Sequence, residues 1–276
     1  MKMLNVTITS NKKITPYIYK MRIKSEYLAK HISPGQFVEV RCSNGTNPLL
    51  RRPFSVHRIL SDSIEILYET VGKGTELLSR KKPGDVLDVI GPLGNGFGLR
   101  NTKYERRTTI LIAGGMGVAP LVALAETIVQ RTAYSVQREK LCVLIGAKKK
   151  EDVLCVRDFK KLGVKVFITT DDGSKGGKGL VTDFLNKVLR NTHYAIRDTQ
   201  IYACGPIPML KATAAIAKAH NIPCQVSLEE RIACGVGVCL GCPVRIVTSH
   251  KSQVTSSEYK MICKDGPIFN AREIAW

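Results

Sequence analysis

The chain has 276 residues, of which 44% are hydrophobic and 24% charged, and its formal net charge is +19. This length suits two domains, or one domain with a small appendage, and the apolar content is that of an ordinary globular protein. The sequence has no apolar run of about eighteen residues, which argues against a membrane-spanning helix, and its first residues show no apolar segment of the signal-peptide type.

The charge and the cysteine content restrict the functional classes further. Nine cysteines without a visible export signal favour a reducing compartment, and we expect the protein to work in the cytoplasm. A strongly basic chain can bind nucleic acid. Here, however, the basic residues are scattered, no run of them exceeds three residues, as at 148–150, and no aromatic-plus-basic RNA-binding motif occurs. We therefore expect neither nucleic acid nor membrane as a partner, and favour a basic surface that faces an acidic partner or nucleotide phosphates.

Residues 1–100 contain short segments in which apolar and polar side chains alternate. Examples are residues 36–41, 63–68 and 86–90, and glycines separate them. A period of two is typical of β-strands with one buried face, and several short strands at this spacing indicate a barrel or sandwich. We expect a first domain over 1–100, an antiparallel β-barrel or sandwich.

Two motifs in this first part suit a dinucleotide. Arg51-Arg52-Pro53-Phe54-Ser55 opens one predicted strand, and a guanidinium group can bind a pyrophosphate with two hydrogen bonds. About twenty residues later, Gly72-Lys73-Gly74-Thr75 precedes a helical segment whose free N–H groups can bind an anion. An Arg-Pro pair alone is more often plain surface. Together the motifs predict one dinucleotide held from both sides, with the hydroxyl group of Ser55 facing its redox-active ring.

From about residue 105 the pattern changes to apolar strands that alternate with helices. The strand-like runs are 109–113, 141–145, 164–169 and 200–203, and the helical stretches are 121–130, 180–189 and 209–220. This alternation predicts a parallel sheet with helices on its faces. We expect an α/β domain over 101–222, joined to the first domain by a linker at 101–107, and a small third domain over 223–276.

Three segments of the α/β part follow predicted strands, at the sheet edge where ligands of such folds gather. The first, residues 114–120, holds Gly114, Gly115, Gly117 and Pro120, and departs from G-x-G-x-x-G because proline stands at its last glycine. A strand-to-helix turn without a ligand is the alternative. The second, Cys204-Gly205-Pro206, could lie beside a nicotinamide, although a lone cysteine is more often a small buried hydrophobe. The third contains Asp172, which could touch ribose hydroxyl groups.

The lysines at 148–150 follow the strand-like run 141–147. They are placed where positive charge could meet the 2′-phosphate of NADP, or they could simply face solvent. The residues by themselves leave the choice between NAD and NADP open.

Four cysteines near the end of the chain are the most specific signal. Cys234, Cys239 and Cys242 follow a C-x4-C-x2-C spacing, and twenty residues separate Cys242 from Cys263. This is the plant-type spacing of a [2Fe–2S] cluster, and the intervening glycines allow the sharp loop that such a cluster needs. A zinc site or two disulfides are the alternatives. Zinc sites usually have two C-x2-C pairs and only one is present here, so iron–sulfur is favoured.

Taken in order, these motifs resemble the ferredoxin–NAD(P)H reductase superfamily. The tail narrows the resemblance. Residues 227–231 before the cysteine loop, 262–269 after it, and 91–97 at the end of the barrel resemble the electron transfer subunits of dihydroorotate dehydrogenase B. The resemblance covers essentially the whole chain.

The resemblance implies an FAD-binding barrel, an NAD-binding domain and a [2Fe–2S] domain. It implies that FAD lies along two strands and one helix start, where Phe54 stands in place of a tyrosine common in the superfamily. These FAD residues would be Arg52, Pro53, Phe54, Ser55, Leu67, Tyr68, Glu69, Gly74 and Thr75. NAD would be bound by Gly114, Gly115, Gly117, Pro120, Asp172, Cys204, Gly205 and Pro206. Ser55 would lie near the flavin ring and Cys204 near the nicotinamide, as the catalytic positions, and the four cysteines would hold the cluster.

The same resemblance implies a partner. An FMN-containing catalytic subunit would oxidise dihydroorotate in pyrimidine (UMP) biosynthesis, and electrons would pass through the cluster and FAD of this chain to NAD+, in a heterotetramer of two copies of each subunit. A different NAD(P)H–ferredoxin-type flavin reductase subunit is the alternative within the superfamily. A basic binding module without enzymatic activity is the alternative outside it.

Overall fold

A computed structural model of the chain describes residues 1–99, 108–131, 141–191, 199–247 and 258–276. The predicted linker at 101–107 lies outside these residues. The chain forms two compact units, and each draws on separate stretches of sequence. Unit 1 comprises Met1–Phe97, Glu229–Val244 and Lys260–Pro267, and unit 2 comprises Gly98–Leu228, Arg245–Tyr259 and Ile268–Trp276.

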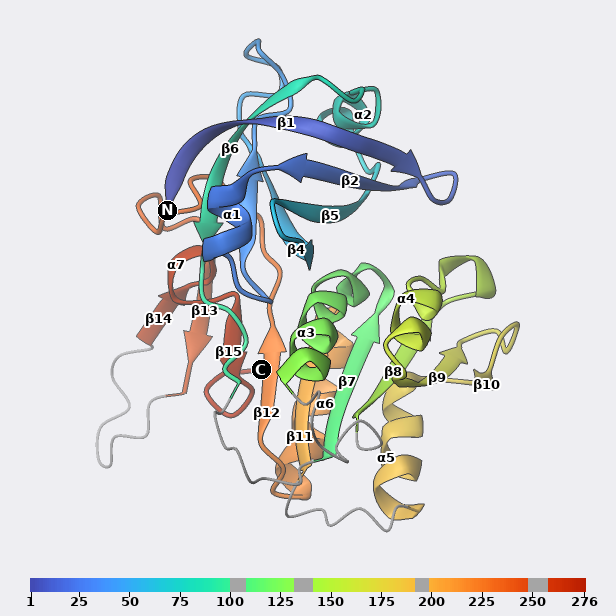
Figure 1. The fold of residues 1–276 in the computed structure, drawn as a ribbon. Helices are drawn as coiled ribbons and strands as arrows, with labels where there is room; N and C mark the ends of the chain where they lie inside the picture. Colours follow the sequence, from blue (N-terminus) through green and yellow to red (C-terminus); the bar gives the residue numbers. More distant parts are fainter. Residues whose placement is uncertain (100–107, 132–140, 192–198, 248–257) are drawn as a thin grey trace. The chain divides into compact units, whose positions relative to one another are not determined.

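Unit 1 is built on a closed antiparallel barrel of six strands in the order β1-β2-β5-β4-β3-β6, which confirms the predicted barrel (Figure 1). The long strand β1 pairs with both β2 and β6 and so closes the barrel. The strands are β1 (Lys2–Lys13), β2 (Ile18–Lys24), β3 (Phe37–Val40), β4 (Arg52–Ile59), β5 (Ser63–Glu69) and β6 (Val86–Leu93), and the helices are α1 (Glu26–His31) and α2 (Lys73–Ser79).

The barrel interior is apolar, and alternation along the strands decides which side chains reach it. Val38 and Val40 belong to the interior core, together with residues such as Ile64, Ile66 and Val89. Because side chains alternate across a strand, Phe37 and Glu39 of β3 point to the outer face. All four residues of β3 are nevertheless buried, so the outer face of this strand is covered as well.

Unit 2 holds a seven-stranded sheet in the order β10-β9-β8-β7-β11-β12-β15. Neighbouring strands are parallel except β12 and β15, which are antiparallel. This confirms the predicted α/β sheet. The strands are β7 (Thr108–Gly114), β8 (Leu141–Ala147), β9 (Lys165–Thr170), β10 (Gly177–Lys178), β11 (Thr199–Cys204), β12 (Cys224–Ser227) and β15 (Ile268–Asn270).

The helices of unit 2 pack on this sheet, for example α3 on β7 and β11 and α5 on β8. They are α3 (Val118–Arg131), α4 (Val156–Lys161), α5 (Val181–Asn191) and α6 (Ile207–Ala219), with 3₁₀ turns η1 (Gly115–Gly117) and η3 (Lys150–Asp152). Among the described residues, no helix combines the length and the apolar character required to cross a membrane.

The C-terminal segment contains β13 (Pro243–Ile246), β14 (Glu258–Met261) and the single-turn helix α7 (Ile262–Asp265). β13 and β14 pair in a small sheet of their own. The chain after residue 223 is thus shared: β12 and β15 extend the sheet of unit 2, whereas residues 229–244 and 260–267 pack with the barrel. The division into three domains at 100/101 and 222/223 stays a prediction. The two compact units do not test it, because each of them combines separate stretches of sequence.

Candidate functional site

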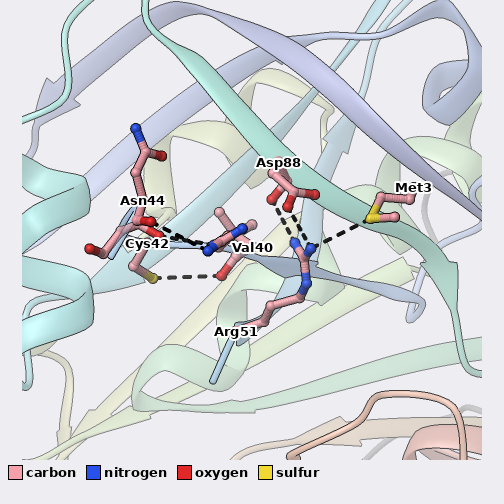
Figure 2. Close-up of polar contacts among 8 residues, drawn as sticks. Met3, Val40, Cys42, Asn44, Arg51 and Asp88 are labelled. Atoms are coloured by element: carbon pink, nitrogen blue, oxygen red, sulfur yellow. Dashed lines mark hydrogen bonds and ion pairs between the residues drawn. The ribbon is translucent and has the colours of Figure 1, made fainter. Parts of the chain in front are cut away.

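The two arginines of the Arg-Arg-Pro motif have different surroundings. The guanidinium group of Arg51 pairs with the carboxylate of Asp88 at 2.6 Å and donates to the Asp88 carbonyl at 2.9 Å (Figure 2). Arg52 donates only to the carbonyls of Leu50 and Arg51, and among the residues that the structure describes it forms no ion pair. The geometry therefore leaves Arg52, and not Arg51, free to meet an anionic group.

The other predicted FAD residues lie close to Arg52 in the fold. Pro53, Phe54 and Ser55 follow it on β4, Leu67, Tyr68 and Glu69 end β5, and Gly74 and Thr75 lie in the first turn of α2. A Cβ on Gly74 would lie 3.3 Å from Nε of Arg52, so the two predicted phosphate motifs are neighbours. The Thr75 hydroxyl accepts from the N–H groups of Val71 and Gly72 and is committed to the start of the helix. That leaves backbone N–H groups, not this hydroxyl, for a ligand.

An aromatic cluster within this region includes two buried residues of the barrel core, Phe54 and Tyr68. Phe54 meets Tyr68 edge to face, with ring centroids 5.6 Å apart, and Tyr68 stacks on Tyr19. Burial raises the pKa of Tyr68, and its hydroxyl donates to Oδ1 of Asn11 at 3.0 Å. Tyr68 thus stays protonated and rigidly held, which suits a residue that supports a planar ring and does no proton transfer.

The glycine-rich turns of unit 2 meet at the carboxyl ends of β7 and β11, which are neighbours in the sheet. A Cβ on Gly117 would collide with the carbonyl of Cys204, and one on Gly205 would lie 2.9 Å from Cα of Gly114. These glycines are therefore required by the packing of one turn on the other, a reason that sequence reasoning did not supply. Gly115 has a φ of +53° and open space around it, so its backbone is the part of the turn accessible to a ligand. Pro120 is buried inside α3 and Cys204 is buried at the end of β11, where Pro206 is exposed.

Asp172 lies on an exposed turn after β9. Its Oδ1 accepts from the backbone N–H of Ser174 at 2.9 Å and from the Ser174 hydroxyl at 2.6 Å, and these bonds hold the pKa of Asp172 below its ordinary value. Residues 148–150 belong to the same edge, because the N–H of Lys150 donates to the Ser174 hydroxyl and that of Asp172 to the Lys148 carbonyl. Two opposite charges thus lie in loops that hydrogen-bond to each other: the lysines would attract a 2′-phosphate, and the carboxylate of Asp172 would repel it.

The four cysteines are brought together in two pairs. The side chains of Cys234 and Cys239 are within hydrogen-bonding reach of each other, as are those of Cys242 and Cys263. The N–H of Gly237 donates to Sγ of Cys263 at 3.1 Å and joins the two pairs. A [2Fe–2S] cluster requires two thiolates on each iron, so this pairing fits the predicted ligand set.

Backbone N–H groups converge on the sulfur atoms. Cys234 Sγ accepts from the N–H groups of Val236 and Cys239, both at 3.5 Å, and Cys242 Sγ accepts from that of Cys263 at 3.4 Å. Burial opposes ionisation of Cys234, but these backbone donors prevail and lower its pKa to about 6. Such donors also lower the energy of thiolate ligands. At Cys234 the backbone thus favours ionised sulfur, whereas burial raises the pKa of Cys263 to about 12. Positive φ angles at Gly235 and Gly237 make the reversal of the loop possible.

The cysteine loop packs on the outer face of β3. A Cβ on Gly235 would lie 2.9 Å from Cγ of Glu39 and 3.1 Å from a methyl group of Leu93. Glu39 is fully buried, and both of its carboxylate oxygens lack a hydrogen-bond partner within the described parts of the chain. Burial raises its pKa to about 8, although Arg51 and Arg52 act to lower it. The sequence analysis missed Glu39, because a single acidic residue in the alternating segment 36–41 is expected on the solvent-facing side of a strand.

The opposite side of the cysteine loop is open. Cys239 is exposed, and its neighbours Val238 and Leu240 are 79% and 66% exposed. Exposed apolar side chains beside a predicted electron carrier could bind a protein partner and be buried by it.

Two known protein families match separate parts of this chain, one the cysteine-containing segment and the other the parallel-sheet part. Residues 229–275 match the iron-sulfur cluster binding domain of dihydroorotate dehydrogenase B. Residues 111–215 match the oxidoreductase NAD-binding domain.

Several curated proteins are similar over nearly the full chain. The dihydroorotate dehydrogenase B (NAD(+)) electron transfer subunit of Caldanaerobacter subterraneus subsp. tengcongensis is 37% identical over 98% of this chain and 98% of its own length. The protein of the same name from Geobacillus sp. (strain WCH70) is 38% identical over 99% of each chain.

Among solved structures, a chain of the NADH-dependent reduced ferredoxin-NADP oxidoreductase, studied for flavin-based electron bifurcation, has a TM-score of 0.77. It is 30% identical and covers 100% of this chain and 91% of its own. The ferredoxin NADP+ reductase of Neisseria gonorrhoeae, with a TM-score of 0.65 and 18% identity over 80% of this chain and 92% of its own, shares the fold.

Proposed function

The chain belongs to the family of dihydroorotate dehydrogenase B electron transfer subunits, and from that premise we propose that it passes electrons from the FMN of a catalytic partner subunit through a [2Fe–2S] cluster and FAD to NAD+. The partner would oxidise dihydroorotate in pyrimidine biosynthesis. The observation that carries the proposal is the packing of the paired-cysteine loop against the barrel, within one compact unit. The predicted cluster ligands and the predicted flavin residues thus belong to one compact unit, which supports the proposal.

A flavin exchanges single electrons with an iron–sulfur centre and a hydride with nicotinamide. The chain's own residues then have the task of binding and orienting. Arg52 is available to bind the FAD pyrophosphate and Gly74 leaves room beside it. Phe54 and Tyr68 support the ring system, with Ser55, Leu67 and Glu69 beside them. Within the described parts of the chain, Arg52 forms no ion pair with a carboxylate, and this supports the assignment.

For the nicotinamide dinucleotide, we assign the phosphates to the turn at Gly115 and the nicotinamide to the neighbourhood of Cys204 and Gly205. Asp172 would accept from the ribose hydroxyl groups through the oxygen that Ser174 does not occupy. Its negative charge, which the lowered pKa preserves, favours NAD over NADP despite the nearby lysines.

The partner would bind at the exposed side of the cysteine loop. Val238 and Leu240 flank the exposed Cys239, so burial of this surface would exclude water from the shortest route to the cluster. We assign two copies of each subunit to the assembly and, from the cysteine content, a reducing compartment such as the cytoplasm.

The decisive experiment is NAD+ reduction driven by dihydroorotate, with and without the FMN-containing subunit encoded in the same organism. We expect activity only when both subunits are present. Oxidation of dihydroorotate by this chain alone would contradict the assignment of substrate chemistry to the partner.

The similarity to the NADH-dependent reduced ferredoxin-NADP oxidoreductase chain favours one second candidate, a subunit of a ferredoxin-linked flavin reductase. Purification of the chain with its native partner distinguishes the two. If the partner reacts with ferredoxin or NADPH and does not oxidise dihydroorotate, the second candidate is the correct one.

A further inference from the structure

The loop after β6 carries an asparagine that binds the segment containing the fourth cysteine. We propose that Asn95 is a positioning residue for the cluster: it caps the helical turn of Cys263 and fixes that ligand to the barrel. The inference rests on the proposed function only in taking Cys263 as a cluster ligand.

Asn95 donates hydrogen bonds to three consecutive carbonyl groups. Its backbone N–H donates to the Gly266 carbonyl at 2.5 Å, and its side-chain amide donates to the Asp265 carbonyl at 2.9 Å and the Lys264 carbonyl at 3.4 Å. These carbonyls belong to the end of α7 and the residue that follows it. The last carbonyls of a helix have no partner within the helix, so Asn95 satisfies them from outside.

The loop that carries Asn95 is itself held firmly on the barrel. Gln36 donates from its amide to the Gly94 carbonyl at 2.6 Å, and the N–H of Phe97 donates to the Pro34 carbonyl at 2.8 Å. Gly94 has a φ of +68°, and a Cβ there would lie 2.6 Å from the Gly266 carbonyl oxygen. The glycine therefore permits the close approach that brings the amide of Asn95 to the helix end.

The capped helical turn α7 contains Cys263 and therefore fixes its position. At the start of α7, the N–H of Met261 donates to the carboxylate of Asp265 at 2.7 Å, and the N–H of Ile262 donates to the Cys242 carbonyl at 2.9 Å. A single turn of helix has too few internal hydrogen bonds to persist alone. Its two ends are thus supported from outside, by Cys242 at one and Asn95 at the other, and the Cys242–Cys263 pair depends on both.

The test uses Asn95→Asp, which keeps the shape of the side chain, removes its N–H donors and points an anion at carbonyl oxygens. Asn95→Ser is a second variant that removes the amide without adding charge, in case the first fails to fold. Asn44→Asp makes the same chemical change on another exposed loop of the barrel and serves as the matched control. The full-length proteins, with cluster and flavin as purified, are mixed with an iron chelator, and loss of the cluster is followed by its visible absorption.

Removing a residue that holds a metal ligand in place typically lowers metal affinity about tenfold or more. We expect Asn95→Asp to lose its cluster at least about tenfold faster than the wild type, Asn95→Ser to fall between them, and Asn44→Asp to match the wild type. The reduced variants should also show an altered EPR signal of the cluster, while bound flavin is retained.

Unchanged cluster loss and an unchanged EPR signal in both Asn95 variants would overturn the inference. Parallel loss of flavin and cluster would overturn it as well, because Asn95 would then support the barrel and not the ligand. Wild-type protein that holds no iron and no sulfide would instead refute the proposed function, so the two failures are distinguishable.

Discussion

Gly235 of the cysteine loop lies directly on the side chain of Glu39: a Cβ at this glycine would stand 2.9 Å from Cγ of the acid. The contact joins a predicted cluster ligand loop to the outer face of a barrel strand. It also buries a carboxyl group for which the described residues provide no hydrogen bond.

We expect Gly235→Ala to weaken the cysteine loop. Its φ of +72° costs an alanine roughly 1–2 kcal/mol, and the added methyl group collides with Glu39. The iron content per chain should fall and the thermal midpoint should drop by several degrees. Gly45→Ala, on an exposed loop of the barrel, is the control, because its Cβ would make an ordinary contact at 3.6 Å with Oγ of Ser43. Equal behaviour of the two variants would contradict the packing argument.

Glu39→Gln tests the buried acid through pH. The folded-state pKa of about 8 lies above the ordinary 4.5, so the stability associated with the protonated form is complete below about pH 4.5 and is lost as the pH rises to about 8. The loss amounts to at most about 5 kcal/mol. We expect Glu39→Gln to gain in thermal midpoint over the wild type as the pH rises from 5 to 8. The exposed Glu26→Gln variant should show a constant difference, and a constant difference for Glu39→Gln would refute the assignment.

Arg51 and Arg52 form a matched pair of variants. Arg52→Ala should reduce FAD affinity by about ten- to a hundredfold with little change in folding, since it removes charge-assisted hydrogen bonds to a phosphate. Arg51→Ala should lower stability by about 1 kcal/mol through the lost pair with Asp88 and affect FAD less. Flavin fluorescence titration and thermal unfolding measure the two effects. An FAD defect confined to Arg51→Ala would reverse the roles.

Gly117→Ala should disrupt unit 2. Its Cβ would collide with the Cys204 carbonyl, which neither turn can avoid because both end buried strands. We expect a loss of about 3 kcal/mol or more, comparable to the largest single-residue effects, and loss of NADH-driven flavin reduction while FAD stays bound to the barrel. Retention of full NADH activity would show that the turns can move apart.

Cys239→Ser addresses how far the cluster and the flavin are independent. Their separation in sequence predicts that flavin binding and its reduction by NADH survive when the cluster is lost. Because the cysteine loop belongs to the same compact unit as the barrel, we expect flavin to remain bound but with a lower thermal midpoint. Visible absorption and calorimetry of the variant provide the measurement, and simultaneous loss of flavin would mean that the loop supports the whole barrel.

Much of this protein could be predicted from local sequence because the relevant signals are local. Cysteine spacing within one loop identified three ligand candidates and indicated Cys263, further along the chain, as the fourth. Alternation with a period of two indicated a barrel or sandwich, and the alternation of strands with helices predicted the parallel sheet. The order of the motifs then indicated the family. Apart from the order of the motifs and the place of Cys263, each of these inferences depends on residues within a few positions of one another.

Tertiary structure decided what depends on contacts between distant segments. Glu39 follows the alternation of an outward-facing position and is buried only because residues 229–244 return to cover its strand. Arg51 and Arg52 are adjacent and chemically alike, and only the position of Asp88 on β6 distinguishes them. Asn95 reaches Asp265 across 170 residues. Sequence periodicity reports which face of a strand a side chain occupies, whereas burial and pairing depend on which other segment arrives at that face.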